Sequence, residues 1–234
     1  MRDDVLHIFE RARADERLIL YEYESKRICE IVGLPVTKFR VAETLEEILD
    51  ASHRIGFPVV LKVISRDISH KTEAGGVLLN LRNDNQIKTG FSQIKANVHN
   101  YDPTARIEGF LVQEMVPPST EVVIGMTKDP TFGAALMFGL GGIFVEVLED
   151  VVFRIAPISH SDAYDMIREI KAYKILTGVR GNPPVDVDAL VNILRKVSDL
   201  VVHHPEIGQL DLNPVIVYPQ GAKIVDARII LEAL

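Results

Sequence analysis

The sequence predicts a fold of alternating helices and strands, α/β or α+β, arranged in two lobes. Stretches with a helical spacing of apolar residues alternate with β-branched runs throughout the 234 residues. Of these residues 47% are hydrophobic, which is enough to bury one large core or two small ones. A strand-rich block begins at residue 109, so we place the break between the lobes near 106–120.

The first part of the chain is expected to form an N-terminal arm and an N-terminal lobe. Residues 1–17 are charge-rich and carry apolar residues at helical spacing, which predicts a short arm or helix. Thr44 and Glu47 form a capping-box pattern that begins a helix, and Gly56 ends that helix. The other expected elements are a helix over 18–32, strands over 35–41, 58–64 and 77–81, and a helix over 84–101. We assign residues 18–110 to this first lobe.

The second lobe, residues 111–234, is expected to be rich in strands. Asp186 is the predicted N-cap of a strongly periodic helix that stops at Pro205. A shorter helix is expected from Ser159 to Ile170. The expected strands of this block cover 109–115, 120–127, 132–139, 151–157, 208–218 and 222–231.

The composition excludes several classes of protein. A formal net charge of −7 argues against a protein that binds nucleic acid. The single cysteine, Cys29, excludes a disulfide framework and fits a reducing cytosol. The first residues show no secretory pattern, and the longest uncharged run, 130–145, is too short to span a bilayer. We therefore expect a cytoplasmic protein without a membrane segment.

The strand over 58–64 and the loop that follows it are the most informative stretch. Lys62 stands among apolar residues of this strand, and a buried ammonium group needs an anion. Gly75 and Gly76 let the backbone approach a bulky anion and offer N–H donors to it. This favours a nucleotide phosphate tail. The alternative, an edge-strand lysine that discourages aggregation, fits less well with apolar neighbours on both sides.

His70 lies in the same loop. Its imidazole has the chemistry of an acid, a base or a phosphoryl acceptor. Loop histidines more often face solvent without a chemical role, and the position of His70 alone favours that interpretation.

The last hairpin suggests a metal site. Asp211 and Asn213 lie two residues apart in a strand, so their side chains point to one face. Asp226 lies in the returning strand, at a distance from the turn that places it opposite Asn213. Three oxygen ligands from adjacent strands suit Mg²⁺. The alternative is that Asp211 and Asn213 only begin a turn at Pro214, but an acid within the apolar returning strand favours the metal.

Three weaker features surround these. The strand end Gln113-Glu114-Met115-Val116 could offer backbone groups to an adenine edge, and Glu121 could accept from ribose hydroxyls. Arg154 repeats the argument made for Lys62, because it is a cation within an apolar strand. The glycine loop over 138–144 differs from a dinucleotide fingerprint, since a strand follows it.

These segments together resemble a known family. The chain resembles the ATP-grasp (β) subunit of the NDP-forming acyl-CoA synthetases, of the ADP-forming acetyl-CoA synthetase type. Seven segments in order carry the resemblance, and they lie at 56–62, 69–77, 112–116, 139–146, 152–157, 179–184 and 210–215. The resemblance implies an α+β ATP-grasp fold, with a nucleotide held between two α+β lobes. It also implies the reaction acyl-CoA + ADP + phosphate ⇌ acid + CoA + ATP.

The resemblance also implies roles for the residues singled out above. Asp211 would lie at the phosphoryl-transfer centre, and His70 matches the position of a second, transient phosphohistidine. Asn213 and Asp226, with Asp211, would bind Mg²⁺. The nucleotide, ADP or ATP, would be bound by Lys62, Gly75, Gly76, Gln113, Glu114, Val116, Glu121 and Arg154.

The resemblance further implies a partner. In that family a CoA-binding α subunit carries a phosphorylated histidine, in an α2β2 assembly. The sequence shows no CoA-binding dinucleotide-type domain, so an obligate partner is expected. Two alternatives stay open: a self-sufficient ATP-grasp ligase that joins a carboxylate to an amine or thiol, and a degenerate nucleotide-sensing module.

Overall fold

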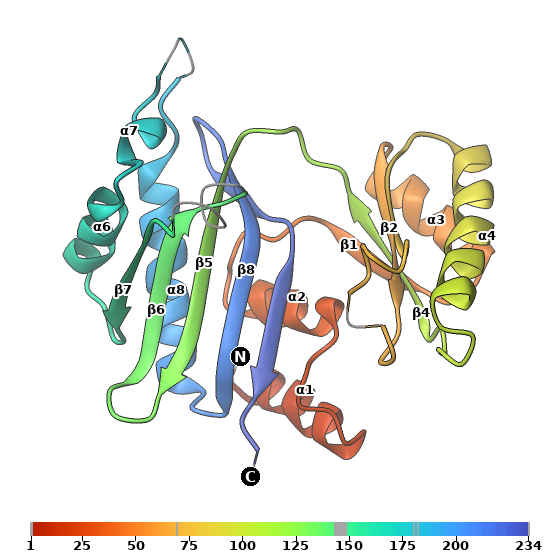
Figure 1. Ribbon diagram of the computed structural model, residues 1–234, viewed down its shortest axis with the longest axis horizontal. Helices are drawn as coiled ribbons and strands as arrows, with labels where there is room; N and C mark the ends of the chain where they lie inside the picture. Colours follow the sequence, from red (N-terminus) through yellow and green to blue (C-terminus); the bar gives the residue numbers. More distant parts are fainter. Residues whose placement is uncertain (1, 69, 143–148, 180, 182, 234) are drawn as a thin grey trace. The chain divides into compact units, whose positions relative to one another are not determined.

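The protein, seen in a computed structural model, consists of two compact units (Figure 1). Unit 1 is formed by Met1–Val36 together with Pro118–Leu234, and unit 2 by Thr37–Pro117. The structure describes residues 2–68, 70–142, 149–179, 181 and 183–233. No helix within these ranges is long and apolar enough to cross a membrane.

Unit 2 is a four-stranded antiparallel sheet with two helices. The strand order is β1-β4-β2-β3. Its elements are β1 (Phe39–Ala42), α3 (Leu45–Ile55), β2 (Val59–Ile64), β3 (Val77–Leu81), α4 (Asp84–Tyr101) and β4 (Gly109–Glu114). Ile48 of α3 and Ile94 of α4 join Val59, Leu61 and Val63 of β2 in one buried cluster. Both helices therefore pack on one face of this sheet.

The predicted capping box and glycine stop of α3 are confirmed, and α4 has a side-chain cap that the sequence analysis did not name. The Thr44 hydroxyl accepts from the Glu47 N–H at 3.2 Å, and the Glu47 carboxylate accepts from the Thr44 N–H at 3.2 Å. Gly56, with φ of 95°, follows α3 in a conformation that disfavours other residues. The side chain of Asn83 caps α4 by accepting from the Gln86 N–H at 3.0 Å.

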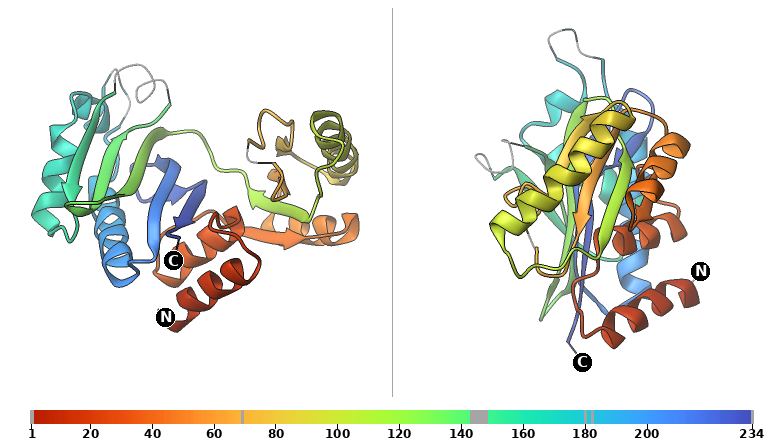
Figure 2. Two further views of the ribbon diagram at one scale, coloured as in Figure 1. Left: turned by 60° about the horizontal axis from the view of Figure 1, so that its bottom comes forward. Right: turned by 90° about the vertical axis from the view of Figure 1, so that its right-hand side faces the viewer.

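Unit 1 is a second antiparallel sheet, with helices on one face. The strand order is β10-β8-β5-β6-β7, and β9 pairs with β8. The strands are β5 (Thr120–Asp129), β6 (Gly133–Leu140), β7 (Val151–Ile155), β8 (Ile207–Val217), β9 (Ala222–Ile224) and β10 (Ala227–Leu231). The helices are α1 (Arg2–Ala14), α2 (Glu22–Ile31), α6 (His160–Glu169), α7 (Tyr173–Leu176) and α8 (Val187–His203). Figure 2 shows α1, α2 and α8 on the same side of these strands.

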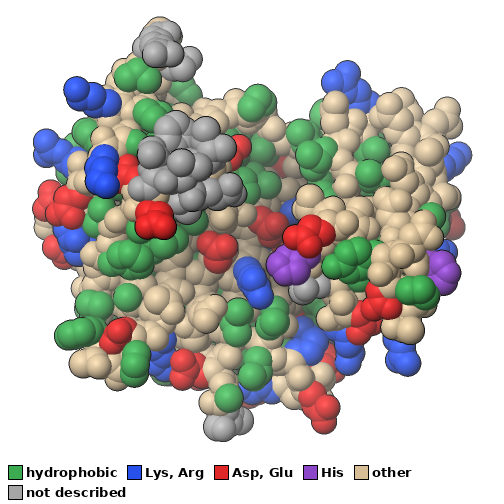
Figure 3. All heavy atoms as spheres, in the orientation of Figure 1, with side chains coloured by type: hydrophobic (Ala, Val, Ile, Leu, Met, Phe, Trp, Pro, Cys, Tyr) green, Lys and Arg blue, Asp and Glu red, His purple; other side chains and the backbone are tan. Residues whose placement is uncertain are grey.

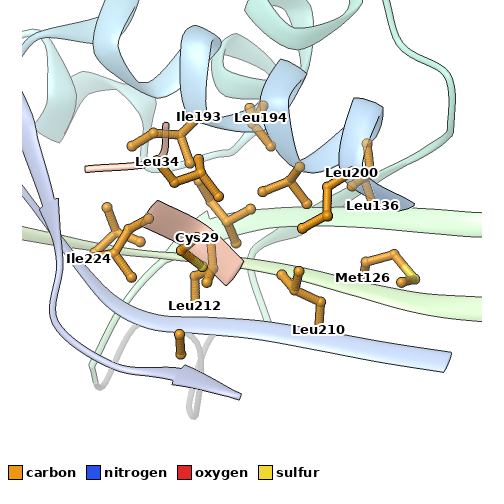
Figure 4. Close-up of a cluster of buried hydrophobic side chains, with 14 of the residues drawn as sticks. Cys29, Leu34, Met126, Leu136, Ile193, Leu194, Leu200, Leu210, Leu212 and Ile224 are labelled. Carbon is orange, nitrogen blue, oxygen red and sulfur yellow. The ribbon is translucent and has the colours of Figure 1, made fainter. Parts of the chain in front are cut away.

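The core of unit 1 lies between these helices and the sheet. Leu194 of α8 and Cys29 of α2 pack over Leu212 of β8, and all three are fully buried (Figure 4). Burial raises the pKa of the Cys29 thiol to about 12, so the cysteine acts as a small apolar residue. The other face of the sheet is not covered by these helices.

The N-terminal segment belongs to unit 1. Residues 2–14 form a helix whose Val5, Phe9 and Ala12 are buried in the core of this unit, so the expected arm is a packed helix. The helix expected over 18–32 begins only at Glu22. The residues before it pair with β10 instead, since the Leu20 N–H donates to the Ile229 oxygen at 3.0 Å.

The division into units therefore differs from the expected lobes in two places. Residues 18–36 lie in the unit formed by the second half of the chain, because α2 packs against β10. The expected boundary at 110 falls inside β4, whose hydrogen bonds to β1 and β2 hold the whole strand in unit 2. The second break, after Pro117, lies within the expected range.

The returning strand of the last hairpin is interrupted. β9 ends at Ile224 and β10 begins at Ala227, so Asp226 lies in the break rather than in a continuous strand. The carboxylate of Asp226 accepts from the Ala227 N–H at 2.9 Å. A carboxylate is tolerated here because the break gives it a local hydrogen bond.

His204 is predicted to make unit 1 sensitive to acid. The ring follows α8, is buried, and meets Phe9 of α1 edge-on at 5.8 Å between centroids. Burial lowers the pKa of His204; the charge of Glu206 opposes this, whereas Arg2 and His203 add to it. The unfolded chain therefore takes up a proton near pH ~6.5 that the folded chain resists. The free energy of unfolding should therefore keep its full value above pH ~6.5. It should decrease as the pH falls from there through the lower pKa that His204 has in the folded chain.

Urea unfolding of wild type and His204→Phe at about pH 7.5 and about pH 5.5 checks this expectation. The phenylalanine keeps the ring contact but cannot take up a proton. We expect a smaller decrease in unfolding free energy on acidification for His204→Phe than for wild type. Equal decreases for the two proteins would contradict it.

Candidate functional site

In unit 2 the predicted phosphate-binding lysine is buried in a central strand. All six residues of β2 are buried, and Lys62 is 6% exposed. Because Val59, Leu61 and Val63 enter the helix-covered core, the alternation of the strand puts Lys62 on the other face. Gln113 pairs with Val60 and so lies on the face of Lys62. The register thus places these two candidate nucleotide-binding residues on one face of unit 2.

The loop between β2 and β3 presents His70 to solvent. The side chain is 68% exposed, and Nδ1 lies 3.9 Å from Oε1 of Glu73, which is exposed as well. Ser69, beside it, lies outside the described residues. The structure therefore leaves His70 accessible to a reacting group from outside unit 2.

The glycine pair in the same loop is required by packing. Gly75 has φ of 62°, and a Cβ there would come 2.7 Å from Nδ2 of Asn97, which donates to the Gly75 oxygen. A Cβ on Gly76 would come 2.6 Å from Cγ1 of Val63. Gly75 and Gly76 therefore have a structural reason that is independent of the predicted phosphate contact.

The end of β4 already uses several of its polar groups. The Glu114 carboxylate accepts from the Lys38 N–H at 2.7 Å, and the Glu114 N–H donates to the Lys38 oxygen. The Met115 N–H donates to the Pro58 oxygen at 3.1 Å. Val116 lies beyond these contacts.

In unit 1 the register brings charged residues together on the face that helices do not cover. Asp211 of β8 lies opposite Gly125 of β5 and opposite Arg228 of β10. The side chains of Asp211 and Arg228 point away from the core, because Leu210 and Leu212, on either side of Asp211, are buried in it. Figure 3 views unit 1 from this face, where acidic and basic side chains lie among hydrophobic ones.

A hollow of about 310 Å³ opens on this face. Its lining comes from three neighbouring strands and consists of Met126, Thr127, Gln209, Leu210, Asp211, Arg228 and Ile230. The hollow therefore places polar donors and a cation directly beside Asp211.

The three predicted metal ligands lie close together. The Asn213 N–H donates to the Asp226 oxygen at 3.3 Å, which agrees with the spacing of the hairpin. Burial raises the pKa of Asp211, the charge of Asp226 raises it further, and Arg228 opposes both. Asn213 and Pro214 form a bulge, since the residues opposite Val122 and Ile124 are Val215 and Leu212. Bulges re-aim side chains next to functional sites.

This donor set fits a hard divalent cation. Two carboxylates that repel each other and an amide oxygen are the ligands that Mg²⁺ prefers, with phosphate oxygens and water completing the shell. Within the described ranges no group of three or more His, Cys, Asp or Glu side chains could hold a metal ion, so this set depends on the Asn213 amide as its third ligand. Asp211, Asn213 and Asp226 are thus the best candidates for a cation in unit 1.

Glu121 marks the start of the glycine loop. It is exposed at the beginning of β5, and its backbone oxygen accepts from the Gly141 N–H at 2.8 Å. A Cβ on Gly141 would come 3.0 Å from Cβ of Glu121, so the loop passes close to this strand. Residues 143–148 of the loop, and residues 180 and 182 of the segment over 179–184, lie outside the described part of the chain.

Arg154 does not lie on the face of Asp211. It pairs with Leu136, which is fully buried in the helix-covered core, so Arg154 points toward the helices. Its guanidinium donates to the Glu169 carboxylate on α6 and to the Phe153 oxygen. The anion that the sequence argument demanded is therefore a carboxylate of the same unit, and the predicted phosphate contact of Arg154 has no support here.

Arg228 is the cation that the sequence analysis missed. It lies in the apolar run Ala227-Arg228-Ile229-Ile230-Leu231, so the argument applied to Lys62 and Arg154 applies to it equally. The hairpin register that placed Asp226 opposite Asn213 also places Arg228 opposite Asp211. This signal was present in the sequence and was not used.

Comparisons with known proteins identify the class of this fold and site. A family model described as ATP-grasp domain matches residues 11–231. The chain therefore belongs to the ATP-grasp family, and the predicted α+β ATP-grasp fold is confirmed.

Particular relatives narrow this class. The chain is 49% identical, over 224 residues and 96% of both chains, to the acetate–CoA ligase [ADP-forming] I subunit beta of Pyrococcus furiosus. A Ca. Korarchaeum cryptofilum dinucleotide forming acetyl-coenzyme A synthetase 1 in complex with coenzyme A, Ca-AMPCP and HgCl+ has a TM-score of 0.94 and 48% identity, covering 97% of this chain and 99% of that one.

A second structure of that synthetase shows it with coenzyme A and Mg-AMPPCP, with its phosphohistidine segment pointing towards the nucleotide binding site. It has a TM-score of 0.87 and 45% identity over 97% of this chain and 100% of that one. The predicted resemblance to the ADP-forming acetyl-CoA synthetases is thereby confirmed.

Arg154→Gln should affect stability rather than nucleotide binding. Loss of a half-exposed ion pair costs up to ~1 kcal/mol of unfolding free energy. We expect the affinity for Mg-ADP, measured by calorimetry, to stay within about twofold of wild type. The matched variant Glu169→Gln should lower stability similarly, and the double variant should show coupling between the two. A tenfold loss of Mg-ADP affinity at unchanged stability would instead restore the phosphate role.

Proposed function

We propose that this chain is the nucleotide-binding subunit of an ADP-forming acyl-CoA synthetase, which catalyses acyl-CoA + ADP + phosphate ⇌ acid + CoA + ATP. The observation that carries the proposal is the 49% identity over 96% of both chains to the Pyrococcus furiosus subunit beta. The chemistry of the uncovered face of unit 1 also supports the proposal, because Asp211, Asn213 and Asp226 lie close together there.

A second subunit completes this activity. The Pyrococcus relative is itself named as a subunit, and a structural relative carries a phosphohistidine segment. We take the partner to be a CoA-binding α subunit that carries a phosphorylated histidine, in an α2β2 assembly. The acyl group and CoA then react on the partner, and this chain handles the nucleotide.

Unit 2 supplies most of the nucleotide contacts. Lys62 neutralises phosphate oxygens, and the backbone N–H groups of Gly75 and Gly76 donate to them. Adenine is held by the strand end that contains Gln113, Glu114 and Val116, through backbone groups rather than through the Glu114 carboxylate, which already accepts from Lys38. In unit 1, Glu121 accepts from ribose hydroxyls.

The phosphoryl group moves between imidazole rings before it reaches ADP. Asp211 accepts a hydrogen bond from the ring N–H of the phosphorylated imidazole that the partner delivers, and this bond orients the ring. His70 takes the phosphoryl group on a ring nitrogen and passes it to the β-phosphate of ADP. Positioning and charge neutralisation, rather than covalent activation, carry such a transfer.

Asp211, Asn213 and Asp226 hold Mg²⁺ in this proposal. The bound ion supplies positive charge to the phosphate oxygens of the nucleotide. The residues of the chain itself hold the base, the ribose and the phosphates in place for the transfer.

The isolated chain is expected to bind Mg-ADP but to make no acyl-CoA. In calorimetry, Lys62→Met, which keeps the buried apolar stem, should weaken Mg-ADP binding by ~1.5–3 kcal/mol, because a charged hydrogen bond is lost. Lys88→Met, at an exposed position of α4, is the matched control and should bind like wild type. Acyl-CoA synthesis by the purified chain alone would favour the self-sufficient ligase instead. A complex with Lys62→Met that kept full activity would favour the degenerate module.

His70→Ala is expected to block ATP formation by the complex while the partner still becomes phosphorylated. The reason is that the phosphoryl group loses its acceptor on this chain. Labelling with radioactive phosphate, acyl-CoA and Mg-ADP, followed by separation of the two subunits, measures both steps. His53→Ala, at an exposed position on α3, is the control. ATP formation by His70→Ala at the wild-type rate would reduce His70 to a loop residue.

A further inference from the structure

One charged residue on the uncovered face of unit 1 has no role in the proposed reaction. Arg228 is exposed on β10, directly opposite Asp211, and lines the same hollow. Among the hydrogen bonds and ion pairs within the described ranges, none engages the guanidinium of Arg228. Its five N–H donors are thus available to a ligand.

The carboxylate of Asp211 repels phosphate oxygens unless a cation lies near it. Asp211 and Asp226 lie close together in the last hairpin, because the Asn213 N–H donates to the Asp226 oxygen at 3.3 Å. A phosphoryl group brought beside Asp211 adds negative oxygens to this pair. Like charges this close repel each other. Arg228 is the cation that lines the hollow, and it lies directly opposite Asp211.

Neutral donors lie next to this cation. Thr127 and Gln209 pair with each other across β5 and β8, and Ile230 follows in the same row on β10. All three line the hollow together with Asp211 and Arg228. A hydroxyl, an amide and a guanidinium around about 310 Å³ suit an anion of the size of a phosphoryl group on a ring.

We infer that Arg228 binds the oxygens of the phosphoryl group that the partner's imidazole delivers beside Asp211. This inference rests on the proposed function and adds a residue to its transfer site. The planar fork of a guanidinium matches two phosphoryl oxygens at once. Asp211 and Arg228 then hold opposite ends of one ligand: the ring N–H and the phosphoryl group.

The phosphoryl transfer that Arg228 assists needs no proton transfer. The bond between phosphorus and the donor ring nitrogen breaks, and that nitrogen keeps the electron pair. The lone pair on a ring nitrogen of His70 forms the new bond to phosphorus. Each ring keeps the proton on its other nitrogen. Arg228 stays protonated and stabilises the charge on the phosphoryl oxygens during the transfer.

A single-turnover experiment on the whole complex tests this inference. The partner is labelled by acyl-CoA and radioactive phosphate, and the labelled complex is mixed with Mg-ADP. We expect Arg228→Gln to slow the loss of label from the partner by about 100-fold, the effect of removing one preorganised donor. Arg228→Lys should fall between Arg228→Gln and wild type, because an ammonium keeps the charge but not the fork. Arg195→Gln, at an exposed position of α8, is the matched control and should behave like wild type.

Binding of Mg-ADP separates this role from a contact to the nucleotide. Calorimetry should give Arg228→Gln an affinity within about twofold of wild type, and labelling of the partner should be unchanged. Transfer by Arg228→Gln at the wild-type rate would overturn the inference. So would a loss of Mg-ADP affinity equal to the loss of rate, which would move Arg228 to the nucleotide. If the wild-type complex itself passed no label from its partner, the proposed function would fail together with this inference.

Discussion

The register of β8 determines both the core and the candidate site of unit 1. This strand pairs with β5 on one side and with β10 on the other, and its side chains alternate between two faces. Leu210 and Leu212 are buried at 2% and 0% exposure, and each contributes roughly 1.5–3 kcal/mol through burial. A slip by one residue would expose both leucines and bury Asp211. The burial of these two leucines in the core therefore suffices to place the Asp211 side chain on the uncovered face.

Two local irregularities complete the site at the same level of the sheet. β8 carries an extra residue at Asn213 and Pro214, and the returning strand is broken at Asp226. The sequence predicted that Asp226 lies opposite Asn213, because both residues are a similar number of positions from the turn of the hairpin. It did not predict the break, since the apolar residues around Asp226 read as one strand. A carboxylate destabilises a continuous strand more than a break in which it can accept a local hydrogen bond. The presence of Asp226 therefore accounts for the interruption of the strand at this position.

Most elements could be predicted from the sequence, because capping residues and periodicity act locally. Thr44, Asn83 and Ser159 cap helices through hydrogen bonds to residues three positions on. The unit that an element joins depends on distant partners, and α2 was assigned to the wrong one for that reason. The face of the sheet to which a strand residue points also depends on distant partners. Arg154 looked equivalent to Lys62 in sequence, but the side chains of β7 alternate with Phe153 exposed at 51% and Arg154 turned toward α6.

A residue type that suits a function is weak evidence when packing already requires it. Gly75 and Gly76 suit a phosphate, yet Asn97 and Val63 leave no room for a Cβ at either position. Arg154 suits a phosphate, yet Glu169 explains its charge. Arg228 differs from these, because its guanidinium makes no hydrogen bond or ion pair within the described ranges although Asp211 lies directly opposite it. A cation held beside acids for the stability of the fold alone would be expected to pair with them. The hollow of about 310 Å³ that Arg228 and Asp211 both line instead has room for a ligand that carries a donor at one end and negative oxygens at the other.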